Sequence, residues 1–488
     1  MAADISYIRE GRPLNLGQQI MLTAKLAVPA IIAQLSTILM QYIDASMVGQ
    51  LGADRSASVG LMNSSLWMFW GVCSMVTMGF SVQVAHRLGA KDDAGARDVM
   101  RQGISACAAF GVFMALLGMA LAPWLPGWLG GTPEIRHDST LYFLIFVSAM
   151  PILTMNYLAG GMLRCAGNMK VPGLLNAVMC VLDIVFNFFL IFPEREVELY
   201  GIPFTCPGAD LGVVGAALGT VLAECVIAGI MMWYLTCRQP DLRLRGRGGR
   251  GSFRPGRPVL RKAARISVPM TLEHIIFCGA QITITVIVAP LGVVAIAANA
   301  FAVTAESLCY MPGFGIGDAA TTLAGQSYGA GRYGLVRRFT YLTVGLGMAV
   351  MTVMSLIMYL CAPLMMAVMS PVGDIVALGT EILRIEAWAE PMYAASIVAY
   401  GAMVGVGDTK IPAIMNFGSI WLIRIPLAAL MAPTMGLQGV WIAMCIELCL
   451  RGLIFLWRMF GGRWLKPDSN AACEDFKARE EMADLGDS

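Results

Sequence analysis

The stretch of sequence that decides the fold is Gly161-Met-Leu-Arg-Cys-Ala-Gly-Asn-Met-Lys-Val-Pro-Gly-Leu-Leu-Asn176. A second version, Gly401-Ala-Met-Val-Gly-Val-Gly-Asp-Thr-Lys-Ile-Pro-Ala-Ile-Met-Asn416, follows 240 residues later. Both versions contain a Gly-Asn/Asp-x-Lys-x-Pro element and end on an asparagine at the same spacing. Self-similarity at a fixed offset is typical of duplicated architectures, so we expect the two halves of the chain to be copies of one structural unit.

The same register extends on both sides of this stretch. Further landmarks coincide without a gap at a shift of 240 residues: Val28-Pro29 with Val268-Pro269, Gln41 with Gln281, Leu51-Gly52 with Leu291-Gly292, Gly89-Ala90 with Gly329-Ala330, Arg97 with Arg337, and Pro151 with Pro391. Near the end of each half, Gly212, Gly215 and Trp233 match Gly436, Gly439 and Trp457 at a slightly different shift. A register held over so long a stretch is not expected by chance.

The composition places the chain in a membrane. Of the 488 residues, 57% are hydrophobic and 14% are charged, whereas a soluble domain carries roughly 25% charged residues. So few charges could not cover a water-exposed surface, which excludes a soluble enzyme, a disordered chain and a nucleic-acid-binding protein. The 13 cysteines include no C-x-x-C pair and the three histidines lie far apart, so we expect no metal site built from them. The polar first twenty residues lack the apolar core of a cleaved signal peptide.

Apolar stretches long enough to cross a bilayer recur along the whole chain. Six lie in the first half, near residues 25–49, 59–84, 99–124, 138–163, 172–193 and 212–236. Six more lie in the second half, near residues 264–289, 299–324, 339–363, 378–403, 411–432 and 437–459. The predicted fold is therefore an all-α integral membrane protein with twelve transmembrane helices.

Basic residues orient these spans. The segment 238–262 is rich in arginine and contains Asp241 as its one acid, and further basic residues flank the even-numbered connections. The opposite loops offer only Arg55, Arg136 and Arg195. The positive-inside rule therefore places both termini in the cytoplasm, with the protein in the cytoplasmic membrane. We expect an N-terminal six-helix lobe at 1–237, a basic cytoplasmic linker at 238–262, a C-terminal lobe at 263–460 and a cytoplasmic tail at 461–488.

Six is an even number of spans, so the second repeat starts on the same side of the membrane as the first. The two six-helix bundles are then parallel repeats, and parallel repeats are typical of transporters that work by rocking-bundle alternating access. The chain contains no nucleotide-binding motif and no nucleophile elbow. We therefore expect a transporter that is not an enzyme, uses no cofactor and draws its energy from an ion gradient.

Several motifs resemble the multidrug and toxic compound extrusion (MATE) family of antiporters. The Gly167–Pro172 and Gly407–Pro412 elements are similar to the family's G-[D/N]-x-[K/R]-x-P pattern, Leu323–Gly331 is similar to its G-Q-x-x-G-A-G pattern, and Asp44–Gly52 is similar to its D-x-x-x-x-G-x-L-G pattern. The resemblance covers nearly the whole chain. It implies export of drug-like organic compounds, cationic or amphiphilic, driven by inward flow of H⁺ or Na⁺, by a protein that functions as a monomer in the lipid bilayer.

Ionisable residues at membrane depth are candidate functional groups, because burying a charge there costs on the order of 3 kcal/mol. In the first half these are Asp44, Asp183 and Glu224, and Asn187 shares the helix face of Asp183. A carboxylate pair with amide oxygens can hold Na⁺, or one proton. The family resemblance implies a cation site at Asp44, Asn156, Asp183 and Asn187. For Asp44 an ion pair with Arg55 is the alternative, and for Asn156 it is an interhelical hydrogen bond.

The second half offers a larger set for a possible second transport site, namely Glu273, Glu386, Glu390, Arg424 and Glu447. Glu306 and Asp318 also lie in span eight, and Asp318 is expected to be a hydrated helix-end residue. Arg424 lies too deep to reach the interface, so we expect it to pair with Glu390 or Glu447. Two other functions remain open. A lipid-linked-precursor flippase would need several deep arginines, and a membrane-embedded enzyme would need a His/Asp or Cys/His cluster.

Overall fold

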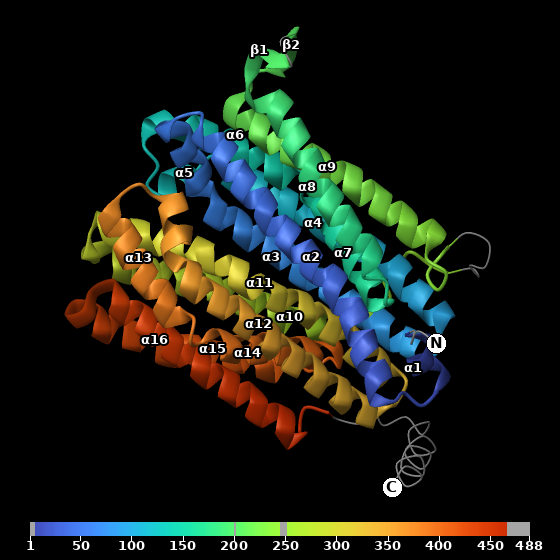
Figure 1. Ribbon diagram of the computed structural model, residues 1–488. Helices are drawn as coiled ribbons and strands as arrows, with labels where there is room; N and C mark the ends of the chain where they lie inside the picture. Colours follow the sequence, from blue (N-terminus) through green and yellow to red (C-terminus); the bar gives the residue numbers. More distant parts are fainter. Residues whose placement is uncertain (1–4, 200–201, 245–250, 466–488) are drawn as a thin grey trace.

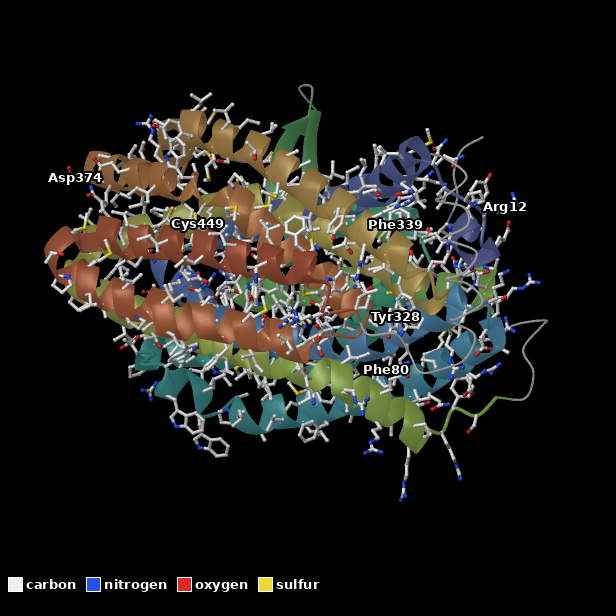
Figure 2. All side chains as sticks on the ribbon, turned by 90° about the horizontal axis from the view of Figure 1, so that it is seen from below. Arg12, Phe80, Tyr328, Phe339, Asp374 and Cys449 are labelled. Carbon is white, nitrogen blue, oxygen red and sulfur yellow. The ribbon has the colours of Figure 1, made fainter. Side chains whose placement is uncertain are left out.

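The computed structural model describes residues 5–199, 202–244 and 251–465 and is almost wholly helical. The helices run roughly along one axis, and the first and last described residues, near 5 and 465, lie at the same end of the bundle (Figure 1). We call this the terminal end. Figure 2 shows Arg12 at the terminal end and Asp374 at the opposite end. The tail 466–488 and the linker residues 245–250 lie outside the described residues.

The first half begins with a short helix and continues with longer ones. The helices are α1 (Ser6–Glu10), α2 (Leu16–Gly49), α3 (Ala53–Gly89), α4 (Asp93–Leu121), α5 (Leu125–Trp128), α6 (Pro133–Ser148), α7 (Met150–Cys165), α8 (Lys170–Ile191) and α9 (Gly212–Trp233), which a π-helical turn, η1 (Tyr234–Arg238), extends. The second half comprises α10 (Arg257–Val288), the 3₁₀ turn η2 (Ala289–Leu291), α11 (Val293–Gly329), α12 (Tyr333–Met369), α13 (Gly373–Glu386), α14 (Glu390–Gly405), α15 (Lys410–Ser419), the π-helical turn η3 (Ile420–Arg424) and α16 (Ile425–Gly461).

The twelve-span prediction is confirmed, although several spans are interrupted. Within the described residues, nine helical segments are long and apolar enough to cross a membrane, and the bent pair α6–α7 makes a tenth. The segment 410–461 contains two of the predicted spans, which meet at Gly436, where the backbone leaves the helical region with φ 61°. The pair α13–α14 supplies the remaining span.

Two of the interrupted spans break at equivalent places in the repeat. Helices α6 and α7 meet at Ala149 at an angle of 48°, and the second residue of α7 is Pro151. Helices α13 and α14 meet just before Pro391, the residue equivalent to Pro151. Proline has no amide hydrogen and its ring clashes with the preceding turn, so it begins a helix readily but does not continue one. The proline therefore explains why both spans are split.

The predicted repeat is confirmed at the level of the helix ends. Helix α3 (Ala53–Gly89) and helix α11 (Val293–Gly329) are related by 240 residues at both ends, and so are α7 and α14. The connecting turns match as well. Gly167 and Gly407 adopt φ values of 90° and 86°, a left-handed conformation that glycine adopts at no steric cost.

Exposed apolar side chains cover the flanks of the bundle. Leu360, Val368, Leu422, Leu430 and Trp457 are all more than 60% exposed. In water such an apolar surface would drive aggregation. It is the surface expected of helices that face lipid, and it fits the membrane location that the composition predicts.

The sequence analysis did not anticipate a two-stranded sheet. Strands β1 (Pro193–Leu199) and β2 (Ile202–Ala209) form an antiparallel hairpin between α8 and α9. The hairpin projects from the end of the bundle opposite the terminal end (Figure 1). Both strands are edge strands, so their outward-facing backbone N–H and C=O groups have no partner in the sheet, and a position beyond the apolar helices lets water satisfy them.

Candidate functional site

The first cluster of polar side chains lies between helices α2 and α8. Helix α2 carries Asp44, and α8 carries Asp183 and Asn187, which are four residues apart and share a face. The Asn187 side-chain amide donates to Asp44 Oδ1 at 2.8 Å and to Asp183 Oδ2 at 3.1 Å. The two carboxyl groups also lie within hydrogen-bonding reach of each other. The structure therefore brings together three of the predicted site residues.

Helix α9 closes this cluster from a third side. Gly219 packs directly on Asn187, because a Cβ atom at this position would collide with Asn187 Oδ1. The next residue, Thr220, lies within hydrogen-bonding reach of Asp183. Sequence reasoning missed both residues. The spacing of four residues between Thr220 and the predicted site residue Glu224 was the signal that could have indicated Thr220, since the two share a face of the helix.

Asn156 and Glu224, two residues predicted separately as site residues, form a pair beside the first cluster. The Asn156 side-chain amide donates to Glu224 Oε2 at 2.6 Å, which joins α7 to α9. Glu224 lies close enough to Asp183 for the two charges to interact. Among the residues that the structure describes, no ion pair joins Asp44 to Arg55, so the alternative role for Asp44 is wrong.

The C-terminal half contains a separate set of buried carboxyl groups. Glu273 on α10 accepts hydrogen bonds from the Tyr400 hydroxyl at 2.7 Å and from the Asn416 side-chain amide. Asn416 is the asparagine that ends the second copy of the repeated stretch. The equivalent residue in the first copy, Asn176, makes no side-chain hydrogen bond within the part of the chain that the structure describes.

Three further buried glutamates in this half lie within electrostatic range of one another. Glu386 and Glu390 are fully buried, and in the described residues none of their carboxyl oxygens has a hydrogen-bond partner. Glu306 on α11 is 6% exposed and lies within electrostatic range of both. We call Glu306, Glu386 and Glu390 the glutamate cluster. Sequence reasoning noted Glu306 as a deep acid but did not count it as a candidate site residue.

The ion pair expected for Arg424 is not formed. Arg424 lies on the π-helical turn η3, and its guanidinium contacts the Met444 sulfur instead. Glu447 pairs with Arg451 at 2.9 Å, a contact between residues four apart on α16. Arg451 was missed, although it lies within the predicted span 437–459 and four residues after Glu447. Arg451 lies one helical turn after Glu447 on the same helix, so this pair can form whatever the position of the other helices. Glu447 therefore pairs with Arg451 and not with Arg424.

Arg424 nevertheless faces acids. Its charge lies within electrostatic range of Glu306 and Glu386 in the glutamate cluster.

Among the described residues, no group of three or more His, Cys, Asp and Glu side chains is placed to hold a metal ion. A sodium site built from Asp44, Asp183 and the Asn187 amide oxygen remains a prediction.

The polar clusters break the symmetry of the repeat. A shift of 240 residues relates Asp44 to Ile284, Asp183 to Ile423 and Asn187 to Leu427. The backbone of the two halves is duplicated, yet the chemistry of the first cluster occurs in one half. Polar groups at membrane depth cost free energy wherever they serve no purpose. The buried polar groups of the first cluster therefore have no counterparts at the equivalent positions of the second half.

Hydrogen bonds hold the two halves together near the terminal end. Gln326, in the Leu323–Gly331 motif on α11, donates to the Cys165 carbonyl oxygen at 2.7 Å. His86 Nε2 lies 2.7 Å from the Gly405 carbonyl oxygen. Asp318, expected to be a hydrated helix-end residue, instead forms an ion pair with Arg164 of the other half at 3.7 Å.

Arg9 adds a third connection at this end. Its guanidinium donates to Gln326 Oε1 at 3.0 Å, to Asp241 Oδ2 at 2.7 Å and to the Ala166 carbonyl oxygen at 3.1 Å. These partners belong to the second half, the linker and the first half, respectively. The short helix α1 therefore joins three parts of the chain through one side chain.

Two parallel repeats of membrane-spanning helices with buried ionisable clusters define a membrane transporter. A family model described as MatE matches residues 29–189 and 269–430. The two matched ranges follow the two repeats and together make up more than half of the chain. The chain therefore belongs to the multidrug and toxic compound extrusion (MATE) family, as its motifs predicted.

Individual relatives agree with this assignment. The chain is 26% identical over 452 residues to a probable multidrug resistance protein NorM of Thermotoga maritima, with 91% of this chain and 92% of that protein covered. It is 28% identical over 429 residues to a probable NorM protein of Pseudomonas aeruginosa, with 86% and 84% covered. A solved outward-facing MATE transporter of the MOP superfamily has the same fold, with a TM-score of 0.82 at 20% identity and 94% and 98% coverage.

Proposed function

We propose that this MATE chain exports small organic compounds in exchange for an inward-moving cation. The relatives' names as probable multidrug resistance proteins support export of drug-like molecules. The observation that carries the coupling part of the proposal is that two carboxyl groups from different helices, Asp44 and Asp183, accept hydrogen bonds from one side-chain amide, that of Asn187.

The paired carboxyl groups favour a proton as the coupling ion. Two like charges in contact cannot both be ionised cheaply, so the pair retains one proton more readily than isolated acids would. Asn187 donates one hydrogen bond to each carboxyl group, which leaves the pair free to share that proton. Uptake of the proton changes the charge between α2 and α8, and this change is what couples ion binding to a rearrangement of the lobe.

Sodium is the second candidate, and a specific observation supports it. Asp183 Oδ1 and Asn187 Oδ1 are buried and accept no hydrogen bond from the described residues. Carboxylate and amide oxygens without donors are suitable ligands for a hard cation. A sodium ion held by Asp44, Asp183 and Asn187 would satisfy both oxygens.

The glutamate cluster and Glu273 form the proposed second site. Four acids in the C-terminal half can take up protons or attract a cationic substrate, and Arg424 supplies a fixed positive charge nearby. The Glu447–Arg451 pair is neutral as a unit. We therefore assign it a supporting role beside the site.

The closed terminal end supports alternating access by rocking of the two lobes. Hydrogen bonds at Gln326, His86 and Arg9 would break when this end opens. We propose that the terminal end faces the cytoplasm, because α1, the end of α16 and the described part of the basic linker lie there. A flippase, one of the alternatives, would need several deep arginines. Arg451 does not support that alternative, because Glu447 neutralises its charge.

The test is efflux from vesicles that contain the purified protein and ethidium. One set of vesicles has an imposed pH gradient, one a Na⁺ gradient, and one neither. Efflux driven by the pH gradient alone is expected if the carboxyl pair shares a proton, and efflux driven by Na⁺ alone would favour the sodium site. Equal efflux in all three sets would contradict ion coupling, and turnover of a membrane-bound substrate without a gradient would favour an enzyme.

A further inference from the structure

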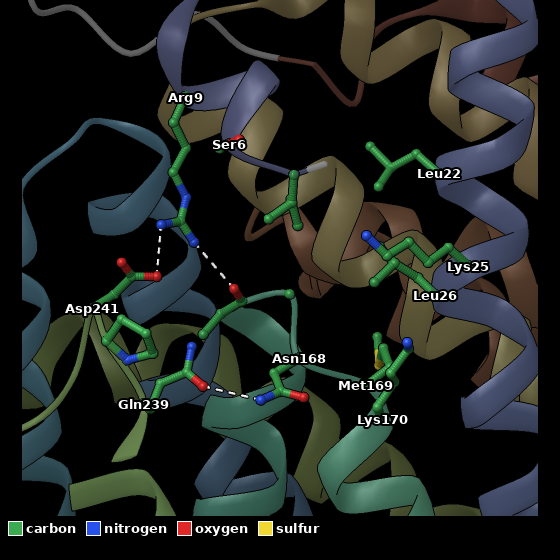
Figure 3. A pocket seen from close by; sticks show the side chains of 14 residues that line it. Ser6, Arg9, Leu22, Lys25, Leu26, Asn168, Met169, Lys170, Gln239 and Asp241 are labelled. Carbon is green, nitrogen blue, oxygen red and sulfur yellow. Dashed lines mark hydrogen bonds and ion pairs between the residues drawn. The ribbon is translucent and has the colours of Figure 1, made fainter. Parts of the chain in front are cut away.

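Arg424 differs from three other arginines whose side chains are mostly buried. Each of those three forms an ion pair with a carboxylate: Arg9 with Asp241 (Figure 3), Arg451 with Glu447, and Arg458 with Asp408. Arg424 is 9% exposed, and among the described residues its guanidinium contacts the Met444 sulfur and no carboxylate. A guanidinium has several N–H donors, whereas a thioether is a weak acceptor. Arg424 therefore carries a buried charge without the partner that such a charge requires.

The backbone at Arg424 also departs from the repeat. Arg424 ends the π-helical turn η3, whereas residues 180–184, which a shift of 240 residues relates to η3, lie inside the unbroken helix α8. The repeat keeps its register up to Asn176 and Asn416, four residues before the turn. The duplicated fold does not by itself require the turn. Such turns are rare and are frequent at functional sites, so the turn marks Arg424 as a residue with a role of its own.

The acids of the glutamate cluster lie near Arg424 without reaching it. The charge of Arg424 is within electrostatic range of Glu306 and Glu386, yet neither forms an ion pair with it. The carboxyl oxygens of Glu386 and Glu390 are buried and have no hydrogen-bond partner among the described residues. An ionised carboxylate in such a place would be a bare charge at low dielectric constant. This arrangement is therefore that of a cluster that holds its protons beside one uncompensated positive charge.

The other ionisable groups around the cluster do not compensate that charge. They are Cys309 and Tyr310 on α11, Tyr393 on α14, and Cys445, Glu447 and Arg451 on α16. Thiol and phenol groups are neutral at about pH 7. Glu447 and Arg451 neutralise each other at 2.9 Å. Among the described groups around the cluster, Arg424 is therefore the cation that can still pair with its acids.

We infer that Arg424 is the internal counter-ion of the glutamate cluster and exchanges with a proton bound there. With the cluster protonated, Arg424 rests on Met444, as in this structure. When one proton leaves to water, the guanidinium moves from the sulfur to the carboxylate of Glu306 or Glu386, and the net charge of cluster and arginine falls from plus one to zero. The planar fork of an arginine can bind both oxygens of that carboxylate.

This exchange links proton release to the backbone. Arg424 ends the turn that joins α15 to α16, so its movement changes the relation of these two helices. The inference deepens the second site of the proposed function and rests on the proton uptake proposed there.

The experiment titrates the buried carboxyl groups of the purified full chain by infrared spectroscopy, since a protonated carboxyl group has a C=O stretching band that a carboxylate lacks. A loss of part of this band in Glu386→Gln and in Glu390→Gln assigns that part to the cluster. Arg424→Gln is expected to raise the pH at which the assigned band disappears by about one to two units, because the carboxylate then lacks a charged hydrogen-bond donor. An unchanged midpoint in Arg424→Gln would overturn the inference.

Met444→Leu tests the opposite direction. It removes the sulfur that holds Arg424 away from the acids, so the midpoint is expected to fall below that of the wild type. Arg424→Lys keeps the charge but not the fork, and should restore part of the shift. A midpoint in Met444→Leu equal to or above that of the wild type would contradict the exchange, and this variant keeps every charge in place if Arg424→Gln does not fold.

The matched control is Arg384→Gln, an exposed arginine on α13 two residues before Glu386. It removes the same charge and should leave the midpoint unchanged, whereas equal shifts in Arg384→Gln and Arg424→Gln would show a general effect of charge and overturn the role of Arg424. The titration requires no transport. A wild type without an assigned band would contradict the proposed protonation of the cluster, and an assigned band that ignores Arg424 would contradict the counter-ion alone.

Discussion

The side-chain amide of Asn187 lies 2.8 Å from the carboxylate of Asp44, a residue 143 positions away in the chain. The contact joins the first and fifth spans of the N-terminal half. It also orients the Asp44 carboxyl toward Asp183, to which the same amide is bonded. The proposed coupling chemistry depends on this connection, and it can be tested with conservative substitutions.

Asp44→Asn is expected to abolish ion-coupled efflux while the protein stays folded. Asparagine has nearly the same shape but can neither release a proton nor supply a charge to a cation. Ethidium efflux from energised vesicles should fall to the level of empty vesicles, with an unchanged elution volume in size-exclusion chromatography. The control is Asp54→Asn, an exposed acid in the first turn of α3. Efflux by Asp44→Asn at the wild-type rate would remove Asp44 from the coupling site.

Breaking the Glu447–Arg451 pair is expected to destabilise the C-terminal half. Both side chains are buried, at 0% and 8% exposure, so removing one charge leaves the other uncompensated. Glu447→Gln should lower the stability by about 3–5 kcal/mol. The double variant Glu447→Leu/Arg451→Met removes both charges and should recover most of that loss. Thermal unfolding in detergent, followed by intrinsic fluorescence, measures both. A double variant less stable than either single variant would contradict this prediction, because the two side chains would then stabilise the protein by more than neutralising each other's charge.

Gly401→Ala is expected to disturb the packing of α11 against α14. A Cβ atom at this position would stand 2.5 Å from the Gly317 carbonyl oxygen, which is backbone and cannot rotate away. The cost of such overpacking is about 1–3 kcal/mol. Gly345 on α12 is the matched control, because a Cβ atom there meets nothing within 4 Å. Gly345→Ala should therefore be roughly 0.5–1 kcal/mol more stable than the wild type. Equal melting temperatures for both variants would contradict the packing at Gly401.

Arg9→Gln is expected to loosen the terminal end. The arginine connects α1, the linker and Gln326, and hydrogen bonds to a charged group contribute about 1.5–3 kcal/mol. Cys165 is buried beneath this contact and 3% exposed. Its modification by a maleimide, followed by mass spectrometry, should be about tenfold faster in the variant. Arg12→Gln is the control, since Arg12 pairs with Glu10 at the exposed surface. An unchanged rate in Arg9→Gln would show that the end is held closed by other contacts.

The sequence by itself determined the membrane class, the twelve spans and the repeat. Each of these depends on local composition, on span length or on an offset within the chain. The Gly167–Pro172 and Gly407–Pro412 elements predicted the duplication, and the helix ends in both halves confirm it. The depth of Asp44 and Asp183 could also be read from their positions along a span. Depth alone does not make two acids neighbours, and it is the structure that brings both of them to the Asn187 amide.

The tertiary structure decided which deep groups meet. The Glu447–Arg451 pair follows from a spacing of four residues on α16, whereas the packing of the helices is what brings Arg424 to Met444 and not to Glu390 or Glu447. Glu306 joins Glu386 and Glu390 through the packing of α11 against α13 and α14, which no spacing in the sequence specifies. The hairpin Pro193–Ala209 also went unpredicted. A sequence gives the height and the face of a side chain on its own helix, whereas the partner depends on the rotation and distance of a second helix.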